Sequence, residues 1–167
     1  NTVDDMRDMT IIGNTTPRYQ YTFNGSISWK DLSLSMMFQG VAKRDWDPGT
    51  APYFWGSGAY AQVTVFNEHM DYWREDNPDA YYPKPYIHSA GGVGPFRNKI
   101  MQTSDRYLQS GAYCRLKNIT LSYNLPSTWV HKAGLQKVQV FFSGENLLTF
   151  TSLKGMFDPE AIFTGNS

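Results

Sequence analysis

The chain has 167 residues, of which 18% are charged, and its formal net charge at pH 7 is zero. Electrostatic binding of nucleic acid needs a basic face, so this balance gives no sign of a nucleic acid as partner, and we expect none. The single cysteine, Cys114, forms no intrachain disulfide and has no partner at metal-ligand spacing, which removes redox and zinc sites. No apolar run approaches the roughly 18 residues of a transmembrane helix.

Residues 1–18 are mostly polar, and the strongest pattern of the chain follows them, from Tyr19 to Trp29. Apolar residues occupy one parity there and uncharged polar residues occupy the other. This period of two predicts a strand with one apolar face. After Lys30-Asp31 the alternation restarts with the opposite parity. A two-residue turn puts both apolar sets on one face only if the parity switches, so the sequence predicts a hairpin over 19–42.

Two kinds of protein contain such a hairpin. In a soluble β-sandwich the apolar face packs against a second sheet and the other face meets water. In an outer-membrane barrel the apolar face meets lipid, the polar face lines the lumen, and aromatic residues gather at both membrane interfaces. The polar face is uncharged from Gln20 to Ser28, and aromatic residues lie at both ends of the hairpin. These details favour the barrel, with a lipid-interface girdle made of Tyr19, Tyr21, Trp29 and Tyr123.

The region 43–110 is irregular and rich in Pro, Gly, Trp and Tyr, with one short helix expected from about Val65 to Glu75. Loops of this length are rare in compact domains but are expected at one rim of a barrel. Aromatic faces beside hydrogen-bonding groups bind sugars or peptides, or anchor a partner protein. The alternative, favoured for any single residue, is that they pack together as the core of the loop. The aromatic residues considered for contact are Trp46, Tyr53, Phe54, Trp55, Tyr60, Tyr81, Tyr82 and Tyr86.

Two further strands are predicted in the C-terminal part. The third runs from about Tyr113 to Leu125, with a bulge expected at Lys117-Asn118, where the apolar parity changes. The fourth runs from Lys137 to about Phe150 and is less regular, because Phe141 breaks the polar parity. The connection between them, residues 126–136, has room for at most one helical turn, with Ser127 as its candidate N-cap.

The remaining polar residues give no case for catalysis. His69 with Asp71 suggests a metal site or an acid–base pair, but His69 has no second histidine nearby and is better explained as a hydrogen-bonded loop residue. His88 and His131 stand alone as well. Asp158 and Glu160 in the motif FDPEA suggest calcium ligands or paired carboxylates, and a structural turn is favoured. We therefore expect no enzyme, no metal and no cofactor.

The connections between the predicted strands are short, very long and short, like the periplasmic turns and extracellular loops of a barrel. The expected fold is all-β, a segment of a large antiparallel transmembrane β-barrel with about four strands and one long extracellular loop. Four strands cannot close a membrane barrel, which needs about eight, so we expect a piece of a larger protein. The expected parts are an extracellular loop end (1–18), a barrel hairpin (19–42), a long extracellular loop (43–110), a barrel strand pair with a short periplasmic connection (111–150) and the start of the next extracellular loop (151–167).

Several segments resemble the C-terminal barrel region of SusC/RagA-type TonB-dependent outer-membrane transporters. They are residues 12–45, 69–86, 105–126, 138–150 and the FDPEA motif at 157–161, in the order and spacing of the family. The resemblance implies a plugged barrel in the bacterial outer membrane that imports glycans or peptides. It also implies a SusD-like surface lipoprotein as lid, TonB as the source of energy, and contact with outer-membrane lipid and with the rest of the barrel.

The family's plug, its TonB-contacting segment and most of its strands lie N-terminal to the region that this chain resembles. Its closing strand would follow the FDPEA motif. The fragment by itself is therefore not expected to transport. The other function that the residues leave open is a soluble β-sandwich module that binds carbohydrate through the aromatic loop.

Overall fold

The computed structural model describes residues 10–49, 51–55, 65–85 and 103–162. They divide into two compact units, each taken by itself below. The sheet unit consists of Thr16–Asp45 and Ser110–Leu153. The loop unit consists of the described parts of Asn1–Thr15, Trp46–Gln109 and Lys154–Ser167.

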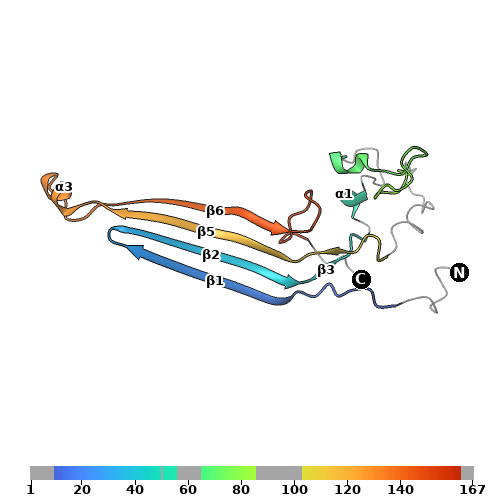
Figure 1. Ribbon diagram of the computed structural model, residues 1–167, viewed down its shortest axis with the longest axis horizontal. Helices are drawn as coiled ribbons and strands as arrows, with labels where there is room; N and C mark the ends of the chain where they lie inside the picture. Colours follow the sequence, from blue (N-terminus) through green and yellow to red (C-terminus); the bar gives the residue numbers. More distant parts are fainter. Residues whose placement is uncertain (1–9, 50, 56–64, 86–102, 163–167) are drawn as a thin grey trace. The chain divides into compact units, whose positions relative to one another are not determined.

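The sheet unit is one antiparallel sheet with the strand order β1-β2-β5-β6 (Figure 1). Each strand has 12 or 13 residues. At a rise of about 3.3 Å per residue and a tilt of about 40°, such a strand spans roughly 30 Å, the thickness of a bilayer's hydrocarbon core. The sheet is open, with β1 and β6 at its edges. The strands are β1 (Arg18–Trp29), β2 (Leu32–Lys43), β5 (Tyr113–Asn124) and β6 (Gln139–Thr151).

The register confirms the predicted hairpin and the predicted bulge. Trp29 pairs with Leu32 across a two-residue turn in which Lys30 has a positive φ of 53°. Farther along β2, Phe38 pairs with Leu116 and Met37 with Asn118, which leaves Lys117 as the extra residue of a bulge. The β5–β6 register shifts at the same place, between Leu116 and Asn118.

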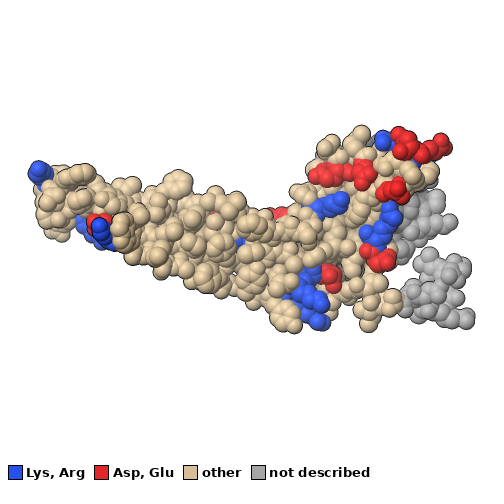
Figure 2. Space-filling model, in the orientation of Figure 1, with Lys and Arg blue, Asp and Glu red and all other residues tan. Residues whose placement is uncertain are grey.

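This register places most of the large apolar residues of the four strands on one face of the sheet, with exceptions such as Met37 and Phe141. Phe23 and Phe142 on that face are 60% and 73% exposed, and no second sheet covers it within the described residues. The sheet therefore lacks the second layer that a β-sandwich requires. In the view of Figure 2 the strands are almost free of charged side chains. The cross-strand rows of the apolar face include Tyr21/Gly40/Cys114/Phe150, Phe23/Phe38/Leu116/Leu148, Ile27/Leu34/Leu121/Phe142 and Trp29/Leu32/Tyr123/Val140.

The helical turn expected between the third and fourth strands is present as α3 (Ser127–Lys132), but its N-cap is Pro126 and not Ser127. The Pro126 carbonyl accepts bonds from the Trp129 and Val130 amides, so the helix begins one residue earlier than a hydroxyl cap would set it. The helix ends at Lys132 with Ala133 as its C-cap, and the next residue, Gly134, has a positive φ of 74° that is easy only for glycine. No helix among the described residues is long and apolar enough to cross a membrane.

The loop unit contains little regular structure. It has the short helix α1 (Pro52–Trp55) and the 3₁₀ turn η2 (Asn67–Met70). The two-residue strands β3 (Asp45–Trp46) and β4 (Gln109–Ser110), each with one residue in either unit, form a separate small sheet. The helix expected over 65–75 is therefore wrong beyond a single turn. The backbone leaves the helical path because Tyr82 bonds to it: the Tyr82 amide donates to the Asp71 carbonyl at 3.0 Å, and the Trp73 amide donates to the Tyr82 carbonyl at 2.9 Å.

Candidate functional site

Seven aromatic rings of the loop unit pack together, and we call them the aromatic cluster. Phe54 at its centre is fully buried, and its ring centroid lies 4.8 to 6.4 Å from those of the other six. Most pairs meet edge to face, the arrangement that suits the ring quadrupoles, whereas Phe157 stacks on Phe54. The members are Trp46, Phe54, Trp55, Tyr81, Tyr82, Tyr107 and Phe157.

Half of the aromatic residues considered for contact are thus buried in a core of their own. Trp46, Phe54, Trp55 and Tyr82 have at most 5% of their surface exposed, so packing is the role that their geometry shows. Tyr81 is half-buried. Tyr60, Tyr86 and the side chain of Tyr53 lie outside what the structure describes, and their contact role stays a prediction.

Sequence reasoning missed two members of the cluster. Tyr107 lies in a segment without a distinctive pattern, and Phe157 was seen only as part of a turn motif. Their contacts with Phe54 span about 50 and 100 residues of sequence, a separation that no local period reports. The FDPEA motif does form a turn, in which the Asp158 carboxylate accepts a bond from the Glu160 amide at 2.9 Å.

His69 is a buried hydrogen-bonded residue of the loop, as expected. Its Nε2 donates to the Phe54 carbonyl at 3.0 Å, and its Nδ1 accepts a bond from the Phe66 amide at 2.9 Å. A carbonyl can only accept and an amide can only donate, so the ring is the neutral tautomer with its proton on Nε2. His69 therefore holds η2 against α1.

Asp71 has other partners and forms no acid–base pair with His69. Its two carboxylate oxygens accept bonds from the Asn77 side chain and the Tyr81 amide, each at 3.1 Å. The Asn77 bond, followed by the Tyr81 bond, lowers the pKa of Asp71 because both stabilise the charged form. Together with the Tyr72–Tyr82 bridge, these bonds fix the chain from 71 to 82. The described residues contain no group of three metal-ligating side chains.

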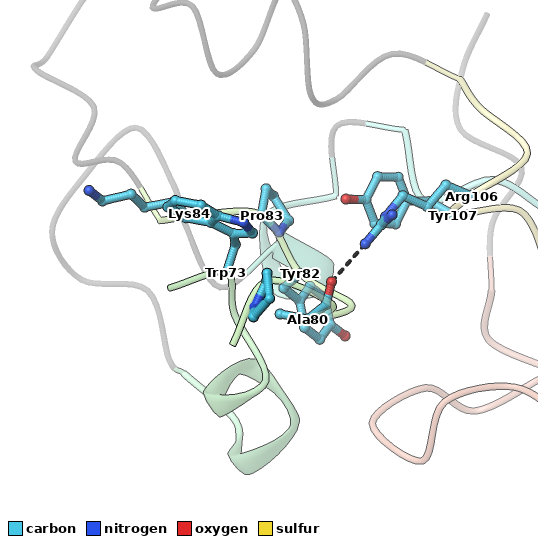
Figure 3. A pocket seen from close by; sticks show the side chains of 8 residues that line it. Trp73, Ala80, Tyr82, Pro83, Lys84, Arg106 and Tyr107 are labelled. Carbon is cyan, nitrogen blue, oxygen red and sulfur yellow. Dashed lines mark hydrogen bonds between the residues drawn. The ribbon is translucent and has the colours of Figure 1, made fainter. Parts of the chain in front are cut away.

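A hollow of about 380 Å³ lies beside the aromatic cluster and shares Tyr82 and Tyr107 with it. Burial raises the pKa of Tyr82 well above its ordinary value, so this hydroxyl stays neutral. Arg106 donates to the carbonyl of Ala80 at 2.7 Å (Figure 3). No motif marked this hollow in the sequence, since its walls come from separate segments. They include Trp73, Tyr82, Pro83, Lys84, Arg106 and Tyr107.

The aromatic residues expected at the lipid interface lie in two bands on the sheet unit. Trp29 and Tyr123 share the row nearest the β1–β2 turn, and Tyr21 lies in a row toward the opposite end, with Tyr19 beyond it. All four are exposed. The Tyr21 hydroxyl donates to the Tyr113 carbonyl at 3.3 Å, across the intervening Gly40 of β2.

Known proteins with similar sequences or structures show which kind of protein carries the sheet and the loop unit. No family model matches the chain. TonB-dependent receptor P3 of Formosa agariphila is 34% identical over 160 residues, or 96% of the chain, and TonB-dependent receptor P26 of the same organism is 27% identical over 154 residues, or 92% of the chain. The chain spans only 14% of the length of either relative.

Solved structures agree with these relatives. The RagAB peptide transporter matches 90% of the chain at 27% identity and a TM-score of 0.61, over 16% of its own chain. The RagAB peptide importer in its open-open state matches 90% at 28% identity and a TM-score of 0.58, over 15% of its own chain.

The chain matches a segment of the SusC/RagA type of TonB-dependent receptors. Such receptors are outer-membrane transport proteins and not enzymes. The resemblance noted in the sequence and the barrel-segment fold are confirmed, and the open sheet is a piece of a barrel wall. A barrel segment, and not the soluble β-sandwich that the sequence left open, therefore describes this chain.

Proposed function

We propose that this segment forms part of the wall and outer surface of an importer that takes up glycans or peptides. The observation that carries the proposal is the two-faced sheet, whose four strands are apolar on one side and mostly small and polar on the other. An importer of this type draws its energy from TonB through its plug region. The description of RagAB as a peptide importer favours peptides as cargo.

We assign the ends of the sheet from its connections. β1 and β2 are joined by a two-residue turn, and β5 and β6 by the short stretch that contains α3. Short connections belong to the periplasmic side of outer-membrane barrels and long ones to the outside. The loop region 43–110 is then extracellular, as are residues 1–18 and 151–167.

The two bands of exposed aromatic residues on the apolar face fit the two membrane interfaces. Tyr19 and Tyr21 would lie at the outer interface, and Trp29 and Tyr123 at the periplasmic one. Rings with one polar atom suit this zone because their apolar body contacts lipid while the polar atom stays hydrated. The Ser, Thr, Asn and Gln side chains of the opposite face would contact the plug or water in the lumen.

The partner that fits the extracellular side is a SusD-like surface lipoprotein that lids the barrel. The aromatic cluster gives the loop unit a packed shape of its own, which a defined contact surface needs. Buried members of the cluster support that surface from beneath, so contacts fall to exposed residues such as Trp73 and to the predicted residues Tyr53, Tyr60 and Tyr86. The proposal thus separates the rings that shape the loop from those that contact a partner or cargo.

Depletion of substrate from the medium tests the proposed function. The full-length gene is expressed together with a gene for the proposed SusD-like lipoprotein, and cells are given a mixture of peptides and oligosaccharides that is followed by mass spectrometry. We expect one class to disappear only when both the gene and the host's TonB are present. Equal depletion in the gene-deleted strain would contradict the importer, and depletion without TonB would contradict its energy source.

A further inference from the structure

The hollow beside the aromatic cluster has a fixed frame. The Trp73 backbone amide donates a hydrogen bond to the Tyr82 carbonyl at 2.9 Å, and Tyr82 is buried within the cluster. Pro83 follows directly and restricts the backbone further. The backbone that carries these walls is therefore fixed without a ligand. Such preorganisation favours binding, because little conformational entropy is lost when a ligand arrives.

Arg106 is oriented before any ligand binds. One of its terminal nitrogens donates to the Ala80 carbonyl at 2.7 Å, and its guanidinium lies 5.7 Å from the Tyr107 ring centroid. Ala80 itself is buried, so this anchor is shielded from water. A guanidinium has five N–H donors in a planar fork, and the anchor uses only part of them. The remaining donors suit a planar acceptor with two oxygens.

The charges that line the hollow differ from those of the rest of the loop unit. Lys84 and Arg106 line it together with no acidic residue, and neither forms an ion pair with a described residue. The other two described cations of the unit are engaged elsewhere: Arg74 pairs with Asp76 at 3.2 Å, and the Lys154 ammonium lies 4.1 Å from the Tyr81 ring centroid. Among the described residues of the loop unit, the hollow is thus lined by two cations that no carboxylate neutralises.

The side chains point to one ligand chemistry. Figure 3 shows Trp73 and Lys84 at one side of the hollow and Arg106 with Tyr107 at the other. The indole of Trp73 is 42% exposed and offers a flat apolar surface beside the cations. A ring stacks on such a surface while an attached carboxylate pairs with the guanidinium. A volume of about 380 Å³ lies at the small end of ligand pockets and suits one or two residues of an oligomer.

We propose that this hollow binds a carboxylate attached to a ring or ring-bearing residue at one end of the imported oligomer. The proposal rests on the importer function above and adds the chemical group by which the loop unit recognises its cargo. Arg106 receives the carboxylate, Lys84 adds charge, and Trp73 supports the ring. A uronic acid and the C-terminal carboxylate of a peptide both present this chemistry.

Direct binding to the full-length transporter in detergent tests the proposal, with saturation-transfer NMR titrations as the readout. The probes are digalacturonic acid with its neutral dimethyl ester, and the peptide Gly-Pro-Phe with a free or an amidated C-terminus. We expect the transporter to bind one acidic probe and to bind its neutral counterpart at least tenfold more weakly. The pair that shows this difference identifies the source of the carboxylate.

Variants then connect the binding to the hollow. Arg106→Gln should weaken binding of the acidic probe about ten- to hundredfold. A charge-assisted hydrogen bond to the carboxylate is lost, while the glutamine amide can still donate to the Ala80 carbonyl. Lys84→Gln changes an exposed side chain that makes no hydrogen bond or ion pair with a described residue, and should weaken binding of the acidic probe about two- to fivefold. Arg74→Gln is the matched control, since it removes the same charge from the unit outside the hollow and should change affinity less than twofold. Limited proteolysis of each variant checks that the loop unit stays folded.

The outcomes separate this inference from the importer function. Binding that is the same for acidic and neutral probes, or that survives both Arg106→Gln and Lys84→Gln, overturns the carboxylate site even if TonB-dependent uptake is intact. Binding that depends on the acid and on Arg106 supports the site even if the uptake assay fails. If the wild-type protein binds none of the four probes at about 5 mM, a concentration at which even a weak ligand would bind, the site is refuted.

Discussion

The sheet unit and the loop unit differ in the burial of their apolar residues. On the sheet, large residues such as Phe23, Ile27 and Phe142 are exposed on one face, while the backbone bonds of paired strands hold the structure. In the loop unit, Trp46, Phe54 and Trp55 are buried against one another, and regular backbone pairing is scarce. One unit is held by its backbone and has lipid as its apolar surroundings in the barrel that we propose, whereas the other builds those surroundings from its own side chains.

This difference determines where a substitution is costly. In the sheet the chemical class of an outward residue matters, because lipid accepts any apolar shape but no charge. In the loop unit shape matters as well, because close-packed rings leave a cavity when one is removed. Four experiments on the full-length protein test this contrast.

The largest effect is expected from Phe54→Ala in the centre of the aromatic cluster. Removing a fully buried ring should destabilise the loop unit by about 3–5 kcal/mol and expose residues 46–109 to protease while the barrel persists. Limited proteolysis and heat-modifiable migration in gels measure the two parts separately. Phe142→Ala, on the exposed face of β6, is the control and should leave the loop resistant. Equal protease resistance of the Phe54→Ala and wild-type loops would contradict a packed core.

A charge on the lipid face should come next. Phe23→Arg places an arginine in the middle of the apolar face and should destabilise the barrel by about 2–4 kcal/mol in lipid vesicles. Asn24→Arg, one residue along and on the opposite face, should cost less than about 1 kcal/mol because it meets the lumen. Urea unfolding of both variants gives the comparison. A larger cost for Asn24→Arg would reverse the assignment of the two faces.

A smaller effect is expected where the Tyr21 ring crosses β2. A methyl group added at Gly40 would lie 2.5 Å from the Tyr21 hydroxyl oxygen and would collide with the Tyr113 carbonyl. Gly40→Val should therefore displace the ring and cost about 1–3 kcal/mol in urea unfolding. Gly25→Val is the matched control, because the atom nearest to a methyl group added at Gly25 lies on the Phe23 ring, 3.3 Å away, and can move. A Gly40→Val barrel as stable as the Gly25→Val barrel would show that this close approach is unimportant.

The smallest effect is expected from protonation of Asp71 at low pH. Its pKa is lowered in the folded loop, so its contribution to stability is complete above the unfolded value of about 3.9 and is lost as pH falls through the folded pKa. Hydrogen exchange of residues 71–82, corrected for the intrinsic rate, should stay constant from pH 7 to 5 and rise below 4. Asn77→Ala should move that rise to higher pH, since it removes the main stabilising bond of the carboxylate. If hydrogen exchange in Asn77→Ala rises at the same pH as in the wild type, the stabilising role of the Asn77 bond is contradicted.

The sequence alone was enough for the sheet, because strand pairing has a period of two that each strand carries in its own residues. The parity switch after Lys30-Asp31 required the Trp29–Leu32 pair, and the parity change at Lys117 required the bulge; both are present. Local signals erred where competing backbone bonds decided the outcome. Ser127 lost the N-cap position to Pro126, and the helix expected over 65–75 gave way to bonds with Tyr82.

The candidate site was beyond local reasoning for a physical reason. Which aromatic residues are buried depends on contacts between segments that lie far apart in the chain, and the composition of the loop is the same whether its rings face inward or outward. Only the tertiary structure placed Tyr107 and Phe157 against Phe54, and only it brought Arg106 to the Ala80 carbonyl beside Trp73. The sequence by itself determined the barrel segment and its family, since a repeating backbone geometry leaves a repeating pattern. The cluster and the hollow leave none, because each is built once, from unique long-range contacts.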